Sequence, residues 1–179
     1  MLKSFSVPAG SSQTFSNVTV TGTGTFGNVV ISGTGTITPS QTGGIVGTTT
    51  NNAVQAGSVG EFVETVVTAG SPVTITISGV SQNLAVVALT AGDWDVGGIV
   101  TVNPGTSVTV MSAGTNTSAT LPAIERQTQL VGVYAGRISA PIPIRQYSLA
   151  ANASVALIAN VTFTGVTNMY GYVNARRVR

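Results

Sequence analysis

The carboxylates of Asp93 and Asp95 come closest, in type and spacing, to residues that could do chemistry; Glu61 and Glu64 are the other close acidic pair. Alternation along a strand would place both aspartates on one face, about 6 to 7 Å apart, a separation that suits the paired acids of a glycosidase. The same residues are typical of a turn followed by a strand, in which Asp93 bonds the local backbone and Trp94 turns into the core. We therefore interpret the pair as structural and Asp93 as a turn residue, with cation binding at Asp93 and Asp95 as the alternative.

The chain contains no His and no Cys. These absences exclude disulfides and thiolate metal sites, and they remove the commonest catalytic base and metal ligand. The segment Gly22–Gly27 formally matches a dinucleotide-binding fingerprint, but no βαβ unit surrounds it and no helix follows to receive a pyrophosphate. We expect neither catalysis nor a cofactor.

Aromatic and basic side chains offer a second kind of chemistry, that of binding. Tyr134, Tyr147, Tyr170 and Tyr172 are expected at the surface, and alternation places Tyr170 and Tyr172 on one face. They would contact a receptor or form an aromatic layer between subunits, whereas Trp94 is expected in the core rather than stacked on a sugar. The remaining candidate receptor or interface contacts are Asn116, Arg176, Arg177 and Arg179.

The three carboxyl-terminal arginines have two functional interpretations. They would clamp the phosphates of a lipopolysaccharide or pair with Glu residues of a neighbouring subunit. A solvated tail is the third interpretation. Because the rest of the chain is nearly neutral, nothing in the sequence indicates a nucleic-acid groove.

Charged residues make up only 7% of the chain, against roughly a quarter in an ordinary soluble domain, whereas 42% are hydrophobic. The polar residues are mostly Thr, Ser, Asn and Gln, which can be buried in an interface without the cost of burying a charge. The longest apolar run, Leu84–Leu89, is far shorter than a membrane-spanning helix needs. The composition therefore predicts large protein–protein interfaces and no membrane insertion.

An eleven-residue repeat occupies residues 15–37, with a truncated third copy from Ile37. Each copy is rich in Val, Ile and Thr and ends in Gly-Thr-Gly, which predicts short strands rather than a helix. One copy contributes few large apolar side chains, so we expect this stem to dock on neighbouring chains or on a host surface. The residues expected to attach it are Phe15, Val18, Val20, Phe26, Val29, Ile31 and Ile37.

A linker composition between residues 39 and 60 predicts two parts, an attachment stem and linker at 1–50 and a folded domain at 51–179. The second part shows about nine strand signals, broken by Gly, Pro, Asn and Asp, without an amphipathic helix between them. This spacing predicts an all-β, antiparallel β-sandwich of the jelly-roll kind. The expected strands are 62–68, 73–77, 84–90, 94–102, 107–111, 130–134, 142–149, 155–164 and 169–178.

Two of these segments carry a more detailed prediction. Residues 73–77 alternate cleanly between apolar and Thr positions, so one face of this strand should be buried. Val155–Ile158 do not alternate, which fits a strand covered on both faces.

Three segments of the second part carry a resemblance to a known family: Gly60-Glu61-Phe62, the segment Leu89–Val96 and the segment Tyr170–Arg177. Through them residues 50–179 resemble a module found in bacteriophage virion proteins. Similar segments occur in small phage structural proteins and at the tips of tail fibres. The resemblance implies a trimeric β-sandwich or jelly-roll knob, and it marks no catalytic residue.

Together these expectations predict a homotrimeric virion surface protein that is made in the bacterial cytoplasm. Its stem would attach to the particle and its knob would project outward. On a tail, the knob would bind a glycan or protein of the host surface through loops such as Gly114 to Thr120. The alternative is a capsid decoration or head-fibre protein that stabilises the shell. A glycan-cleaving tailspike enzyme is less favoured, because His is absent and carboxylates are scarce.

Overall fold

The computed structural model describes residues 56–179. The repeat at 15–37, its seven attachment residues and the predicted boundary near residue 50 lie outside the described residues. The fold below is that of the carboxyl-terminal part alone.

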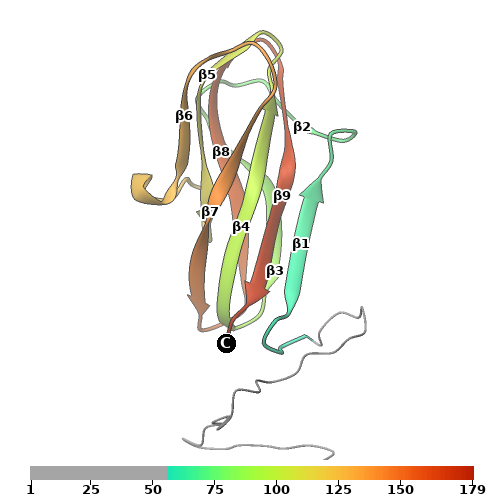
Figure 1. Cartoon of the computed structure of the whole chain (residues 1–179), viewed down its shortest axis with the longest axis vertical. Helices are drawn as coiled ribbons and strands as arrows, with labels where there is room; N and C mark the ends of the chain where they lie inside the picture. The colour runs from blue at the N-terminus through green and yellow to red at the C-terminus, as the bar shows by residue number, and fades with distance from the viewer. Residues whose placement is uncertain (1–55) are drawn as a thin grey trace, which may run out of the picture. The chain divides into compact units, whose positions relative to one another are not determined.

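The described residues form nine β-strands and one short 3₁₀ helix, η1 (Ile124–Arg126) (Figure 1). Each predicted strand overlaps one of the observed strands, so the all-β prediction is confirmed. No helix among residues 56–179 is long and apolar enough to cross a membrane. The strands are β1 (Phe62–Val67), β2 (Val73–Ile75), β3 (Ser81–Leu89), β4 (Gly92–Asn103), β5 (Ser107–Asn116), β6 (Thr128–Tyr134), β7 (Ile138–Leu149), β8 (Ala153–Thr164) and β9 (Thr167–Arg177).

The strands form two antiparallel sheets that face each other as a β-sandwich (Figure 1). The five-stranded sheet has the order β1-β9-β4-β7, with β2 also paired to β9, and the four-stranded sheet has the order β3-β8-β5-β6. β1 and β2 share one edge of β9, at opposite ends of that strand. Only β1–β2 and β5–β6 connect strands of one sheet; every other connection crosses to the opposite sheet.

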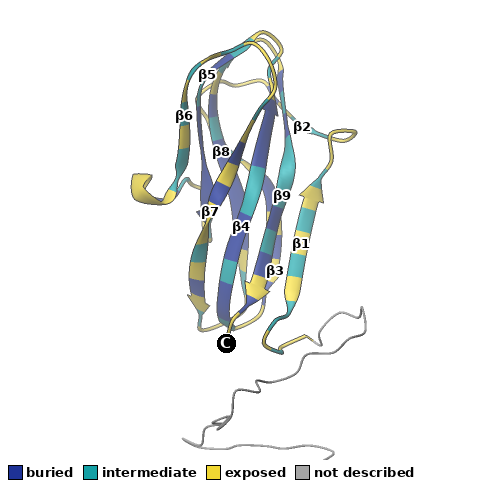
Figure 2. Ribbon diagram, viewed as in Figure 1, coloured by how far each residue is buried: buried dark blue, intermediate teal, exposed yellow. Residues whose placement is uncertain are grey.

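The core lies between the sheets and is built by strand alternation. On β4 the side chains of Trp94, Val96, Val100 and Val102 point inward and are fully buried, which confirms Trp94 as a core residue. β1 shows the complementary pattern of alternating exposed and half-buried residues (Figure 2). Burial of each large apolar side chain contributes about 1.5 to 3 kcal/mol, so this interior stabilises the sandwich without disulfides.

The strand β8 is covered on both faces, as predicted. Val155 and Leu157 point into the core, whereas Ile158 lies outside the core cluster and is nevertheless fully buried. Its neighbour in register is Gly114, and a Cβ built on Gly114 would lie 2.6 Å from Cγ of Pro122. The loop after β5 therefore packs onto this part of the outer face, and the missing side chain at Gly114 gives it room.

The prediction for residues 73–77 is only partly right. Ile75 is buried, but β2 ends there and the side chain of Ile77 is 63% exposed. β2 pairs with only the first three residues of β9, and the chain then turns toward β8, where the amide of Gly79 donates to the carbonyl of Val161. Alternation continues in the sequence beyond the point at which a partner strand supports it.

The two ends of the sandwich are formed by different segments of the chain. One end, called the base below, holds residues 57–61, the β3–β4 turn and the end of β9 (Figure 1). A hydrogen bond from Gly60 N to Arg177 O joins the first of these segments to the last. The other end, called the tip, holds the connections β1–β2, β4–β5, β6–β7 and β8–β9. Both ends carry candidate functional residues.

Candidate functional site

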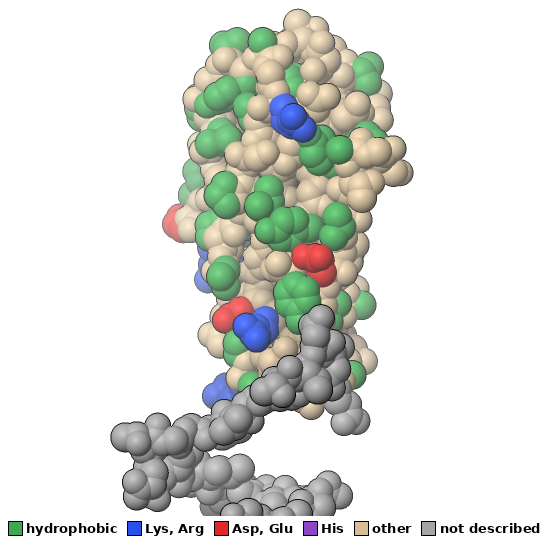
Figure 3. Space-filling model, turned by 45° about the vertical axis from the view of Figure 1, so that its right-hand side comes forward, with side chains coloured by type: hydrophobic (Ala, Val, Ile, Leu, Met, Phe, Trp, Pro, Cys, Tyr) green, Lys and Arg blue, Asp and Glu red, His purple; other side chains and the backbone are tan. Residues whose placement is uncertain are grey.

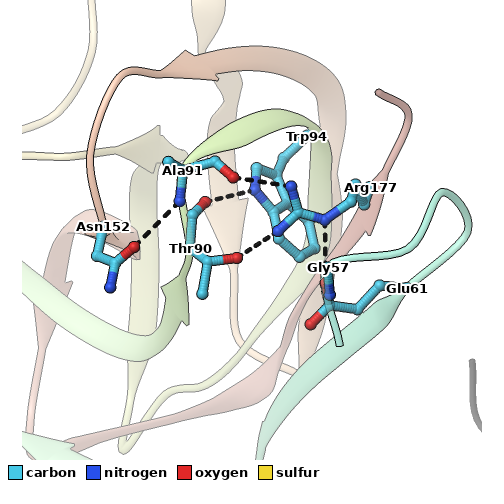
Figure 4. Close-up of polar contacts among 7 residues, drawn as sticks. All are labelled: Gly57, Glu61, Thr90, Ala91, Trp94, Asn152 and Arg177. Atoms are coloured by element: carbon cyan, nitrogen blue, oxygen red, sulfur yellow. Dashed lines mark hydrogen bonds and ion pairs between the residues drawn. The ribbon is translucent and has the colours of Figure 1, made fainter. Parts of the chain in front are cut away.

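The base is organised around the side chain of Arg177, which is almost fully buried (Figure 4). Its guanidinium stacks on the Trp94 ring, and its Nε lies 3.0 Å from a carboxylate oxygen of Glu61. Nη1 donates to the carbonyl of Ala91 at 2.8 Å, and Nη2 donates to the hydroxyl of Thr90. The indole Nε1 of Trp94 donates to the carbonyl of Thr90 at 2.9 Å. Arg177 thus joins the end of β9 to two segments distant in sequence, one at Glu61 and one at residues 90–94.

Glu61 completes this cluster. The backbone amide of Gly57 donates to its carboxylate at 2.8 Å, and this bond, with the ion pair to Arg177, holds the pKa of Glu61 below its ordinary value. The side chain of Glu61 is only 13% exposed, so its partners replace most of the lost hydration. The cluster therefore fixes the segment that leads into β1 against the end of β9.

Asp93 lies at the base as well, as the second residue of β4. It accepts a hydrogen bond from Nε of Arg179 at 2.6 Å, and the Ser148 hydroxyl, followed by Arg179, lowers its pKa. Asp95 lies two residues on, opposite Arg176 and Gln146 in the neighbouring strands. Within residues 56–179 there is no group of three acidic, His or Cys side chains placed to hold a metal ion.

The outward face of the five-stranded sheet, called the sheet face below, carries both tyrosines predicted to share a face. Tyr172 lies in a row with Val66 on one side and with Ile99 on the other, and Pro141 of β7 continues the row. Phe62, Val66 and Ile144 are 59%, 54% and 75% exposed. Figure 3 shows scattered hydrophobic side chains over the visible face, with few charges between them. The sheet face is an exposed surface of mixed apolar and uncharged polar character.

Tyr147 does not reach the surface, contrary to the prediction. Its side chain is 6% exposed, its hydroxyl donates to Oγ1 of Thr115 at 3.0 Å, and the guanidinium of Arg145 covers its ring. A β-bulge of β7 opposite Val96 and Gly98 shifts the alternation of the strand. The inward position of Tyr147 depends on that shift, which the sequence pattern alone does not show.

Asn116 ends β5 and organises the loop that follows. Its Nδ2 donates to the carbonyl of Thr120, and its Oδ1 accepts from the amide of Thr117, both at 2.9 Å. This loop leaves the side of the sandwich next to η1 rather than the tip (Figure 1). The predicted contact loop therefore lies apart from Tyr170.

At the tip, Tyr170 takes part in a hollow of about 350 Å³. Its hydroxyl accepts a hydrogen bond from Nη1 of Arg137 at 3.0 Å, and the amide oxygen of Asn168 accepts one from Thr74 at 2.9 Å. The hollow collects side chains from four connections and strand ends, so it exists only in the folded domain. Its lining residues are Ala69, Pro72, Asn103, Arg137, Asn168 and Tyr170.

Arg137 is the functional candidate that the sequence analysis missed. Both ion pairs among the described residues lie at the base, and none of the residues lining the hollow is acidic. The bond to Tyr170 raises the pKa of Arg137 further, so the guanidinium is cationic at any physiological pH. The sequence did contain a signal for this residue: Arg137 is a single charge in the turn between two predicted strands, in a chain with few charges.

Comparison of the chain with protein-family models, with curated proteins and with solved structures finds no match. What the domain does is therefore inferred from its own surfaces. These are the sheet face and the hollow at the tip.

Proposed function

We propose that the protein is a non-enzymatic structural protein on the surface of a bacteriophage particle. In this proposal three copies form a short fibre or knob, the amino-terminal repeat fastens it to the particle, and the knob binds a glycan or protein of the host surface. The resemblance of residues 50–179 to phage virion modules supports it. The scarcity of charge supports it too, because such a surface associates at little desolvation cost.

The observation that carries the proposal is the strand order. The orders β1-β9-β4-β7 and β3-β8-β5-β6, with β2 continuing the edge begun by β1, give four strand positions in each sheet. Six of the eight connections pass between the sheets, and this order favours a jelly roll as the finer description of the sandwich. This architecture recurs in viral capsid and lectin domains, so it favours a domain that assembles and binds. Fold alone does not fix function, and the surfaces supply the second argument.

The sheet face supports self-association. Val66, Tyr172, Ile99 and Pro141 form a row across four strands, and Ile144 stands beside Gly97 in the adjacent row. Apolar residues aligned across a sheet and at least partly exposed favour an interaction site, and their burial contributes about 25 cal/mol per Å². We place the contact between copies on this face.

Native mass spectrometry of the full chain tests the assembly. We expect a trimer at micromolar concentration, which Val66→Asp and Ile144→Asp should dissociate by burying a charge in the contact. Thr164→Asp, at an exposed position of the opposite sheet, is the matched control and should leave the trimer intact. A stable monomer of the unaltered chain at this concentration contradicts the proposal.

The same face favours one alternative, a capsid decoration or head-fibre protein. A surface with exposed apolar side chains and few charges is also suited to lie against the uncharged parts of a shell. Imaging of purified particles that carry a labelled chain separates the two: label at the tail supports the fibre, and label confined to the shell supports decoration. Deletion of residues 1–44 should release the label in both cases, whereas persistent attachment would place the anchor within the knob.

A further inference from the structure

The hollow at the tip has the size and the polar groups of a sugar site. Its volume of about 350 Å³ lies at the small end of the range for ligand pockets, so it suits one ring rather than an oligosaccharide. The carboxamides of Asn103 and Asn168 each supply a donor and an acceptor, the combination that neighbouring sugar hydroxyls need. The ring of Tyr170, which is half-buried, adds an apolar surface beside them.

The positive charge of Arg137 favours a ligand that carries a negative charge. One of its five N–H groups is used by Tyr170, and its Nε and Nη2 make no hydrogen bond to any described residue. Guanidinium groups bind carboxylates through two parallel hydrogen bonds, which are shorter and stronger than those to neutral oxygens. The Tyr170 hydroxyl accepts from Arg137, so its own proton is free to donate to a bound oxygen.

The surroundings favour an anion over a neutral sugar. The lining residues include no Asp or Glu, and the acidic partners of Arg177 and Arg179 lie at the base, the opposite end of the sandwich. Figure 3 shows one basic side chain alone in the upper half of the visible face, whereas the acidic side chains lie lower. A cation without a neighbouring carboxylate leaves its charge available to a ligand.

We propose that the hollow at the tip binds a single carboxylate-bearing sugar ring, a hexuronate, of a bacterial surface polysaccharide. Arg137 pairs with the carboxylate, Asn103 and Asn168 bind ring hydroxyls, and Tyr170 holds Arg137 in place while its ring covers the sugar. This site rests on the proposed host-surface binding, since it names the ligand class that such binding would use. Weak single sites of this kind gain affinity when three copies bind one polysaccharide.

Saturation-transfer NMR and titration of the full chain with galacturonate and glucuronate test the site, with galactose as the neutral control. We expect at least one uronate to bind with a dissociation constant in the millimolar range, at least tenfold tighter than galactose. Arg137→Gln should weaken uronate binding at least tenfold, and Arg126→Gln, an exposed arginine outside the hollow, should leave it unchanged. The proposal is overturned if neither uronate binds, or if Arg137→Gln binds them equally well. If galactose 6-phosphate binds more tightly than either uronate, the proposed carboxylate ligand is wrong and Arg137 binds a sugar phosphate.

Binding of the labelled full chain to host cells separates this site from the proposed function. If the chain binds cells but binds no uronate through Arg137, the tip site is wrong and the function stands. If the chain binds uronate through Arg137 but no cell surface, the site stands and host binding is wrong. Loss of cell binding in Arg137→Gln, with normal trimers and unchanged thermal unfolding, supports both.

Discussion

The guanidinium carbon of Arg177 lies 4.3 Å from the centre of the Trp94 ring. Stacking of this kind contributes about 2 kcal/mol when both groups are desolvated, and here it joins the end of β9 to the beginning of β4. The same guanidinium also binds Glu61, Ala91 and Thr90, so one side chain connects the segments that form the base of the domain.

Arg177→Ala should destabilise the full chain by about 3 kcal/mol, because it removes the stacking and leaves the carboxylate of Glu61 desolvated without its partner. The neighbouring Arg176 is exposed, so Arg176→Ala should change the free energy of unfolding by less than about 0.5 kcal/mol. Urea denaturation followed by Trp94 fluorescence measures both. Equal, small effects of the two variants would show that the base cluster contributes nothing to stability.

Acid should destabilise the domain through Glu61. The pKa of Glu61 lies below the ordinary value of 4.5, chiefly because the Gly57 amide donates to the carboxylate. At a pH near these values the folded chain therefore binds fewer protons than the unfolded chain does. The resulting stabilisation is present above pH 4.5 and is lost as the pH falls through the lower pKa of the folded state. Glu61→Gln should be less stable at pH 7 and lose less stability on acidification, as measured by thermal unfolding between pH 7 and pH 3. Glu64→Gln, at an exposed position of β1, should keep the acid dependence of the unaltered chain.

Gly114→Ala should lift the loop that covers Ile158. The added methyl group would lie 2.6 Å from Cγ of Pro122 and 3.0 Å from the carbonyl oxygen of Arg126, so the loop has to move. We expect a loss of about 1 to 3 kcal/mol and faster tryptic cleavage after Arg126. At Gly136 a Cβ meets nothing within 4 Å, and Gly136→Ala should stay within about 1 kcal/mol of the unaltered chain. Unchanged proteolysis of Gly114→Ala would show that the loop tolerates the methyl group in place.

Asp93→Asn and Asp95→Asn should leave assembly and cell binding unchanged. Asp93 pairs with Arg179, whose side chain is 86% exposed, and exposed ion pairs contribute at most about 1 kcal/mol. Native mass spectrometry and binding of labelled chain to host cells check both variants. Loss of cell binding by a variant that folds and assembles normally would restore these carboxylates as a functional site.

The strands could be predicted because local residue types indicate where each strand begins and ends. Val, Ile and Thr runs such as Ser107–Val110 are separated by Gly, Pro and Asn at the turns, and the structure follows these breaks. Tyr147 and Ile77 were misplaced because a bulge and an early strand end alter which face a residue occupies. Both events depend on the neighbouring strand, and alternation in one segment contains no information about it.

The hollow at the tip could not be predicted, because its residues come from separate connections. Asn103, Arg137 and Asn168 are each unremarkable in the sequence, and only the order of the strands brings them together. The burial of Arg177 escaped the sequence analysis for a similar reason: its partners Glu61 and Trp94 are distant in the chain. Local pattern thus predicts elements, whereas sites formed by pairing need the topology.

The central place of β9 in its sheet has a consequence for biosynthesis. β9 pairs with β1, β2 and β4, so three strands made earlier wait for a partner that is translated last among them. Until β9 has been translated, the inward face of β4 and the unpaired edges of β1 and β2 stay open to other chains. Folding of the sandwich should therefore wait until β9 is available and should be slow, because it is dominated by non-local pairing; a ribosome stalled before residue 167 should carry a chain that binds chaperones.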